Sequence, residues 1–239
     1  MYLITNRNLC NEDRYFEVIK ECMENRVENI IIREKDLDNN SLEILCKNIK
    51  GLRSKVNTEE NNSDKYIITG DNLDDISKGI EIDSEISNIN NKSCTNLIVN
   101  SNIRIYENGD VDGIHLPFNM FLDLIHQGYE FDKEKILGIS IHTLDEIKIL
   151  EQLKKHINVN ISYIILSHIY ETKCKENLRP KGIIFLNEAK KITDLKIVAL
   201  GGILPQNVKN TLNYCDDIAV MSTIMKSKDV TKVINDYKV

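Results

Sequence analysis

The chain has 239 residues, a formal net charge of −6, 41% apolar residues and 28% charged residues. This composition is typical of a soluble globular protein, with one large domain or two small ones. The negative charge argues against a nucleic acid or an anionic membrane as a partner, and no apolar run approaches the roughly 18 residues of a membrane span. The N-terminus lacks signal-peptide features and the six cysteines have no zinc-binding spacing, so we expect a cytoplasmic protein with free thiols.

Short β-rich runs recur along the chain, and most are followed by a helical pattern. We expect eight strands, at 2–6, 28–33, 96–100, 112–116, 135–141, 162–166, 196–200 and 217–221. Between them lie amphipathic stretches such as 143–156, whose apolar residues recur near the 3.6-residue period of a helix. Nearly all-apolar strands that alternate with helices indicate a parallel sheet covered on both faces. Eight such units in this length predict an α/β fold, a closed (β/α)8 TIM barrel.

The spacing of the expected strands along the chain is irregular at one place. The second and third expected strands start 68 residues apart, whereas the other starts are 16 to 34 residues apart. The excess, 53–93, is Asn-rich, polar and acidic. We expect a single TIM-barrel domain over 1–239 with this insertion between helix 2 and strand 3. A surface insertion is the simpler interpretation, and a subdomain or oligomer contact is the alternative. In either case the segment should emerge at the N-terminal, non-catalytic face of the barrel.

Two loops have the features of a phosphate site. Gly201 and Gly202 follow the seventh expected strand and precede a helix, while Ser222 and Thr223 follow the eighth strand at a helix start. Backbone N–H groups at helix N-termini bind anions, and the loops after strands 7 and 8 form the recurrent phosphate site of TIM barrels. The alternative is that the glycines only permit a tight turn and that Ser222 only caps its helix.

The polar residues at the other strand ends are candidates for substrate binding, because active sites of TIM barrels lie there. Arg33 and Lys35 are two residues apart, so on a strand both side chains point to one face and suit a carboxylate or pyrophosphate. The alternative is a solvated charge run. Asn100 is a further candidate for this anion, and the expected substrate pocket contains His115, Ser140, His168, Thr172 and Lys175.

His142 is the best candidate for a general acid and base, because it lies at the mouth after the fifth strand and an unperturbed histidine titrates near neutral pH. The alternative is a packing or capping histidine, since Thr143 and Glu146 form a capping-box pattern directly after it. His115 and His168 fit structural roles more readily. No carboxylates at the strand ends have a metal-binding spacing, so we expect no metal site.

The chain resembles the thiamine phosphate synthase and TenI superfamily along nearly its full length, apart from the insertion. The matching segments, in order, are YLITNRNLC, IIIREKD, LIVNS, VDGIHLP, LGISIHTLDE, YIILSHIYETKCKENLRPKGIIFL, IVALGGILPQNV and IAVMSTIM. The resemblance implies the same barrel and one of two activities. The synthase joins a hydroxymethylpyrimidine pyrophosphate to a thiazole phosphate with magnesium. The TenI-like tautomerase aromatises a thiazole carboxylate phosphate by moving a proton, without a metal.

The chain departs from the synthase pattern at positions that would bind the metal. Ile31 replaces the Gln of Gln-x-Arg-x-Lys, Ser101 replaces the Asp after strand 3, and Met120 replaces the Asp after strand 4. Magnesium prefers oxygen ligands, usually carboxylates. Asp123 is the nearest substitute, about one helical turn further on. These departures argue against the synthase.

The segment after strand 6, His-Ile-Tyr-Glu-Thr-x-Cys-Lys, looks like the TenI branch, which favours a metal-independent thiazole tautomerase without cofactor. The resemblance then assigns the catalytic histidine to His142, the substrate carboxylate to Arg33 and Lys35, and the phosphate to the loops after strands 7 and 8. The alternatives are the synthase, which alone would need magnesium, and a non-catalytic regulatory protein that binds a thiazole or thiamine phosphate. The expected partner is a small phosphorylated thiazole. The sequence does not decide whether the chain forms a homo-oligomer.

Overall fold

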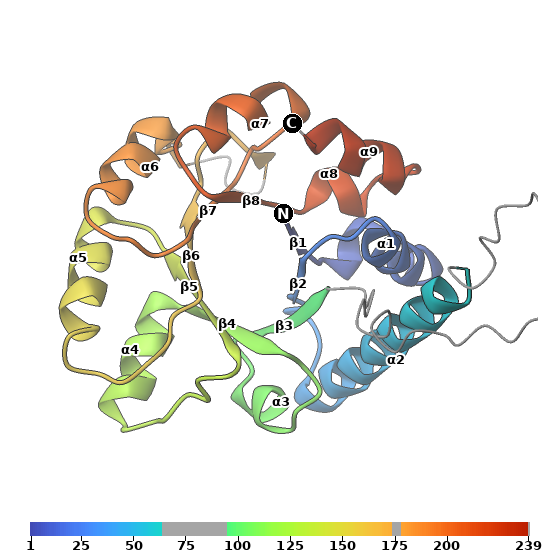
Figure 1. Cartoon of the computed structure of the whole chain (residues 1–239), viewed down its shortest axis with the longest axis horizontal. Coiled ribbons are helices and arrows are strands. Elements are labelled where there is room, and N and C mark those ends of the chain that lie inside the picture. The colour runs from blue at the N-terminus through green and yellow to red at the C-terminus, as the bar shows by residue number, and fades with distance from the viewer. Residues whose placement is uncertain (64–94, 174–177, 239) are drawn as a thin grey trace, which may run out of the picture.

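The computed structural model describes residues 1–63, 95–173 and 178–238, and it shows a closed barrel of eight parallel strands (Figure 1). The strands are paired in sequence order, and β8 closes the barrel by pairing with β1. Each of the eight strands overlaps its range expected from the sequence, with ends that differ by at most two residues. Their bounds are β1 Tyr2–Ile4, β2 Asn29–Ile32, β3 Asn96–Asn100, β4 Gly113–Pro117, β5 Ile136–Ile141, β6 Tyr163–Ser167, β7 Ile197–Leu200 and β8 Asp217–Val220.

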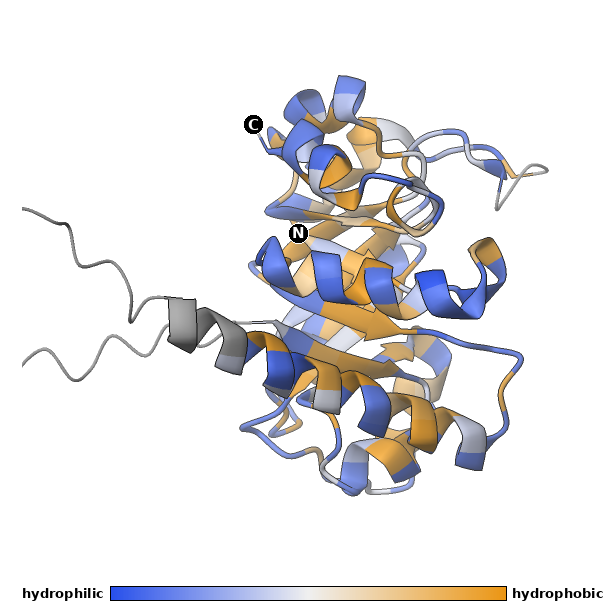
Figure 2. Cartoon of the chain, turned by 90° about the vertical axis from the view of Figure 1, so that its right-hand side faces the viewer, coloured by the Kyte–Doolittle hydropathy of each residue, from blue (hydrophilic) through white to orange (hydrophobic). Residues whose placement is uncertain are grey.

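Helices surround the barrel on its outside (Figure 1). Their apolar faces turn towards the strands, as the hydropathy colours of Figure 2 show. None of the helices in the described ranges has the length and apolar character needed to cross a bilayer. The helices are η1 Arg7–Leu9, α1 Glu12–Glu24, α2 Asn39–Ser63, α3 Ile103–Glu107, α4 Phe118–His126, α5 Leu144–Leu153, α6 Gly182–Lys190, α7 Pro205–Leu212, α8 Ser222–Met225 and α9 Val230–Tyr237.

The inside of the barrel is filled by side chains. Because residues alternate between the two faces of a strand, each strand contributes apolar residues both to the helix layer and to the interior. The interior cluster contains Tyr2, Ile4, Ile31, Ile98, Tyr163, Ile165, Val198 and Ala219. The Tyr163 ring lies directly over Gly138, where a Cβ atom would come within 2.1 Å of the ring. The barrel interior is therefore a packed core.

The helix α2 is longer than the sequence suggested. It continues to Ser63, and Val56 is 1% exposed and belongs to the core between helices and strands. The expected insertion over 53–93 therefore starts too early, because residues 53–63 are helical and their first turn packs on the barrel. The remainder of the expected insertion, 64–93, lies outside the described residues.

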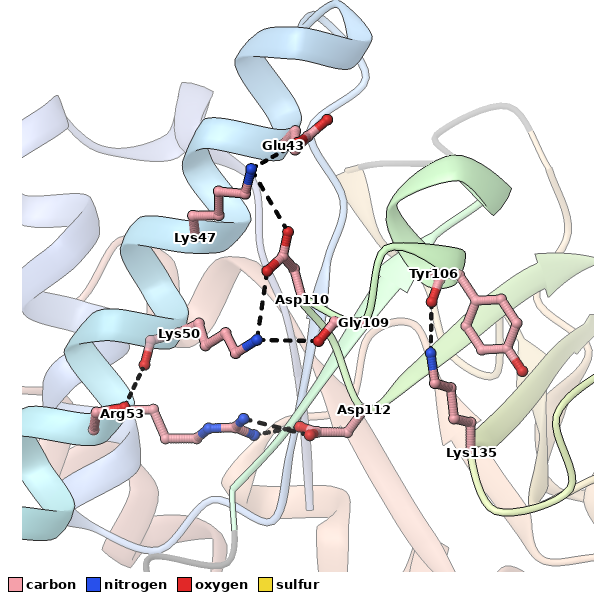
Figure 3. Close-up of polar contacts among 10 residues, drawn as sticks. Glu43, Lys47, Lys50, Arg53, Tyr106, Gly109, Asp110, Asp112 and Lys135 are labelled. Carbon is pink, nitrogen blue, oxygen red and sulfur yellow. Dashed lines mark hydrogen bonds and ion pairs between the residues drawn. The ribbon is translucent and has the colours of Figure 1, made fainter.

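Polar contacts fix α2 to the segment between α3 and β4 (Figure 3). Arg53 pairs with both carboxylate oxygens of Asp112 and also donates to the carbonyl of Thr95, 3.1 Å away. Asp112 in turn accepts a 2.8 Å hydrogen bond from the N–H of Leu97 at the start of β3. Lys50 binds Asp110 at 3.4 Å. These contacts all lie at the end of the barrel where the strands start, so Thr95 re-enters the barrel at the face expected for the insertion.

Candidate active site

The carboxyl ends of the eight strands meet at one mouth of the barrel, opposite the end held by Arg53 and Asp112. The candidate residues expected from the sequence come from the ends of β2 to β8 and the loops after them. The topology therefore brings the described candidates to one side of the molecule. The structure shows how each side chain is held there.

His115 of β4 lies below the mouth, in the barrel interior. Its ring is 4% exposed, and it stacks on the Tyr163 ring with 5.6 Å between centroids. The Nδ1 atom lies 3.2 Å from the Tyr163 hydroxyl, and the Nε2 atom lies 2.7 Å from the Ser140 hydroxyl. Burial lowers the pKa of His115 to about 3, and the nearby positive charge of Arg33 acts in the same direction. His115 is therefore neutral at physiological pH.

His142 follows the last residue of β5 and is exposed at the mouth. Its backbone N–H donates to Glu146, which belongs to the capping box that Thr143 forms at the start of α5. The backbone of His142 thus has the expected capping role, whereas its ring remains available. The Nδ1 atom lies 3.4 Å from the carbonyl oxygen of Ser167, which can only accept a hydrogen bond. The hydroxyl of Ser167 lies 3.3 Å from the same Nδ1 atom and can donate or accept a hydrogen bond. The Nε2 atom has no hydrogen-bond partner among the described residues, so it faces the mouth unpaired.

The end of β2 differs from the expected geometry. The strand ends at Ile32, and Lys35 lies exposed in a turn, whereas Arg33 is half-buried. The premise that Arg33 and Lys35 alternate along one strand is wrong, because the chain leaves the sheet before both of them. Both still lie at the mouth, and Arg33 is close enough to act on His115.

Glu34 shows why the chain leaves the sheet at this point. Its side chain is 5% exposed and accepts hydrogen bonds from the Thr5 hydroxyl at 2.5 Å, the Tyr15 hydroxyl at 2.9 Å and the Arg7 N–H at 2.8 Å. Thr5 accepts in turn from the N–H of Arg33 at 3.1 Å. The alternative that the charged residues around Arg33 and Lys35 are all solvated is therefore wrong for Glu34. The sequence analysis missed this carboxylate because its partners are 19 to 29 residues away in the chain.

The glycine loop after β7 packs against the loop after β6. Gly201 and Gly202 both have positive φ angles, of 99° and 66°. A Cβ atom on Gly202 would lie 2.4 Å from the Glu171 carbonyl oxygen, so both conformation and space require glycine. Asn207 closes the loop by donating to the Gly202 carbonyl at 3.0 Å and accepting from the Leu204 N–H at 2.9 Å. The loop is therefore rigidly held.

The start of α8 lies beside this loop. The Tyr237 hydroxyl of α9 lies 2.9 Å from the Ile203 carbonyl oxygen and 3.0 Å from the Thr223 hydroxyl, and so connects the two loops. In the described part of the chain, the backbone N–H groups of Gly202, Ile203 and Ser222 have no hydrogen-bond partner. Such N–H groups at adjacent loop ends suit an anion such as phosphate.

The remaining candidates lie in the loop after β6. His168 is 4% exposed, and its Nε2 atom lies 3.1 Å from the carbonyl oxygen of Leu178 in the same loop. The ring thus holds the loop in place. Thr172 is half-buried nearby, and Lys175 lies outside the described residues.

The comparisons with known proteins identify the family. A sequence profile described as thiamine monophosphate synthase matches residues 75–224, which is more than half of the chain. The chain belongs to the thiamine monophosphate synthase family. The superfamily expected from the sequence is thereby confirmed, without a distinction between its two branches.

Similar members of the thiamine monophosphate synthase family carry the name thiamine-phosphate synthase. Thiamine-phosphate synthase 1 of Aquifex aeolicus (strain VF5) is 30% identical over 155 residues, which are 64% of this chain and 69% of that protein. Thiamine-phosphate synthase of Clostridium tetani (strain Massachusetts / E88) is 25% identical over 242 residues, with 99% and 92% of the chains covered. These names fit the synthase alternative better than the tautomerase.

The solved structures show the same fold. The thiamine phosphate pyrophosphorylase from Pyrococcus furiosus superposes with a TM-score of 0.66 at 20% identity, covering 99% of this chain and 92% of the other. The (S)-3-O-geranylgeranylglyceryl phosphate synthase from Thermoplasma acidophilum superposes with a TM-score of 0.60 at 10% identity, covering 99% and 90%. At these identities the likeness concerns the fold alone.

The residues at the ends of β3 and β4 do not fit a magnesium site. Ser101 follows β3, accepts a 3.0 Å hydrogen bond from the Asn100 amide and has a positive φ of 60°. Met120 lies in the first turn of α4, and Asp123 is exposed further along that helix. No group of three or more potential metal ligands occurs among the described residues. The chain thus belongs to a family of synthases but lacks carboxylates at these two positions.

Proposed function

We propose that the protein binds a phosphorylated thiazole at the mouth of the barrel and aromatises a thiazole carboxylate phosphate by proton transfer. The phosphate would lie at the loops that contain Gly201, Gly202 and Ser222, where three N–H groups have no partner among the described residues. The substrate carboxylate would lie at Arg33, with Lys35 and Asn100 beside it. Thiamine biosynthesis as the setting follows from the family.

His142 would transfer the proton. Its Nε2 atom removes the hydrogen from the ring carbon that bears the carboxylate, and the electrons of that C–H bond enter the ring. The exocyclic double bond takes up the same proton from the imidazolium at its outer carbon, so the ring becomes aromatic with no net gain or loss of protons. A positioned histidine contributes about 10²–10⁴-fold to such a step.

The observation that carries this proposal is the side-chain chemistry at the mouth. Ser101 and Met120 supply no carboxylate for a magnesium ion, whereas His142 is exposed and its Nε2 atom has no hydrogen-bond partner in the described part of the chain. The second candidate is thiamine-phosphate synthase, which the names of the relatives favour. The third is a regulatory protein that binds the same ligand without turnover.

One pair of assays separates these functions. The purified chain is incubated with the unaromatised thiazole carboxylate phosphate, with either magnesium or a chelator, and the ultraviolet absorbance is followed. In parallel it is incubated with hydroxymethylpyrimidine pyrophosphate, thiazole phosphate and magnesium, and thiamine phosphate is detected by its fluorescent oxidation product. We expect equal turnover with and without metal in the first assay and none in the second. Metal-dependent thiamine phosphate formation would establish the synthase, and ligand binding without turnover would establish the regulatory protein.

A further inference from the structure

A chain of buried hydrogen-bonding groups runs from the barrel interior to the mouth, and the proton transfer at His142 does not use it. It begins at the Tyr163 hydroxyl, passes through both nitrogens of His115 and ends at the Ser140 hydroxyl. Tyr163 is 1% exposed and His115 is 4% exposed, whereas Ser140 is partly exposed. Only the last group of the chain can therefore contact a ligand.

The direction of these hydrogen bonds follows from what each group can donate. Within the described part of the chain, the Tyr163 hydroxyl has one hydrogen-bond partner, Nδ1 of His115. A buried phenol that donates to no acceptor loses free energy, so this hydroxyl must donate and Nδ1 must be unprotonated. Neutral imidazole then carries its proton on Nε2, which faces the Ser140 oxygen at 2.7 Å. Burial and the charge of Arg33 disfavour the imidazolium form, in which both nitrogens would donate.

We propose that Tyr163 and His115 are positioning residues that fix the Ser140 hydroxyl as a hydrogen-bond donor to the ligand. Since Ser140 accepts from His115, its own proton is directed to the mouth. The ligand atom next to Ser140 is therefore an acceptor, such as a carboxylate oxygen or an unprotonated ring nitrogen, and a donor such as an amino group is disfavoured there. The identity of the ligand rests on the proposed function, whereas the direction of the hydrogen bonds does not.

The tautomer of His115 can be measured without any ligand. In protein with ¹⁵N-labelled histidine, two-bond ¹H–¹⁵N correlation spectra distinguish protonated from unprotonated ring nitrogens, and the His115→Gln variant identifies the signals of this ring. We expect a single neutral tautomer with the proton on Nε2, unchanged from pH 8 to pH 6. In Tyr163→Phe we expect a mixture of tautomers, because the donor to Nδ1 is absent. A wild-type proton on Nδ1, or an imidazolium near neutral pH, would overturn the proposal.

A double-mutant cycle tests whether Tyr163 affects ligand binding through Ser140. The dissociation constant of the aromatic thiazole carboxylate phosphate is measured by calorimetry for the wild type, Tyr163→Phe, Ser140→Ala and the double variant. We expect Tyr163→Phe to weaken binding about threefold to tenfold, the range for one neutral hydrogen bond. In the Ser140→Ala background the same change should have less than about a twofold effect, because the group it orients is gone.

The matched control is Tyr2→Phe. The Tyr2 ring packs on Tyr163 with 4.7 Å between centroids, so this variant also removes a phenol hydroxyl from the barrel interior, but outside the chain of hydrogen bonds. We expect its dissociation constant to equal that of the wild type. Equal effects of Tyr163→Phe with and without Ser140 would overturn the proposal. Failure of the wild type to bind would overturn the proposed function only, because the tautomer is measured in the free protein.

Discussion

Within the described ranges, the ring of His142 has hydrogen-bond contacts only at Nδ1, so its removal should change catalysis rather than folding. We expect His142→Asn to lower kcat for the thiazole carboxylate phosphate by about 10²-fold or more, with KM changed less than threefold. Steady-state kinetics followed by ultraviolet absorbance measure both constants. The control is His126→Asn, which replaces an exposed histidine in the last turn of α4 and should keep wild-type kinetics. A wild-type rate in His142→Asn would contradict the assigned role.

The buried, neutral state of His115 has a consequence for stability at acidic pH. In the unfolded chain His115 takes up a proton near pH 6.5, whereas in the folded chain its pKa is lowered to about 3. Between these values the unfolded state binds more protons, so the free energy of unfolding falls as the pH falls below 6.5. From pH 8 to pH 5 this one group should remove about 2 kcal/mol.

Urea unfolding of the wild type and His115→Gln at pH 8, 6.5 and 5 measures this contribution. Glutamine does not titrate, so the stability difference between the two proteins should shrink by about 2 kcal/mol towards pH 5. Other titrating groups are shared by both proteins and cancel in the difference. Parallel pH profiles would show that His115 is protonated to the same extent in both states.

At the scale of elements, the sequence predicted the strands and helices closely and the side-chain roles less well. Eight apolar runs in alternation with helices leave few alternatives to a closed parallel barrel. The helix α2 was placed too short, because its polar continuation past Arg53 resembles the Asn-rich segment that follows. Glu34 was missed as a buried residue, since a carboxylate between Arg33 and Lys35 reads as surface charge until Thr5 and Tyr15 are brought to it by the fold.

The contact between α2 and the start of β4 should be a measurable part of the stability. Arg53 is held by two acceptors, Asp112 and the Thr95 carbonyl, and its side chain is 19% exposed. We expect Arg53→Ala to lower the free energy of unfolding by about 2 kcal/mol, because charge-assisted hydrogen bonds are lost and Asp112 keeps a charge without its partner. Urea unfolding measures the change. Lys55→Ala, on the exposed face of the same helix, should change it by less than about 0.5 kcal/mol.

At the scale of the whole molecule, the barrel separates its two ends. The functional candidates lie where the strands end, whereas α2 and Thr95 flank the chain segment 64–94 where the strands start. The sequence alone predicted this separation from strand order. It could not predict the interior chain of Tyr163, His115 and Ser140, because three residues 23 to 48 positions apart meet only when β4, β5 and β6 pair in this register.

This separation predicts that the segment 64–94 is dispensable for the proposed chemistry. Ten residues of helix beyond Arg53 rise about 15 Å, so a linker of about ten Gly and Ser residues can return from Ser63 to Thr95. We expect the protein with this replacement to keep kcat/KM within about threefold. Circular dichroism shows whether the barrel is retained. A folded but inactive replacement would show that the segment takes part in catalysis or assembly.

The Tyr163 ring over Gly138 also determines how small molecules reach and leave the mouth of the barrel. Because the described residues pack the barrel interior, they leave no passage for small molecules from one end to the other, and the site opens at the mouth. Product must leave by the route through which the next substrate arrives. In the proposed reaction, the aromatised thiazole should therefore compete directly with its own precursor, so that accumulation of product slows turnover without any separate regulatory site.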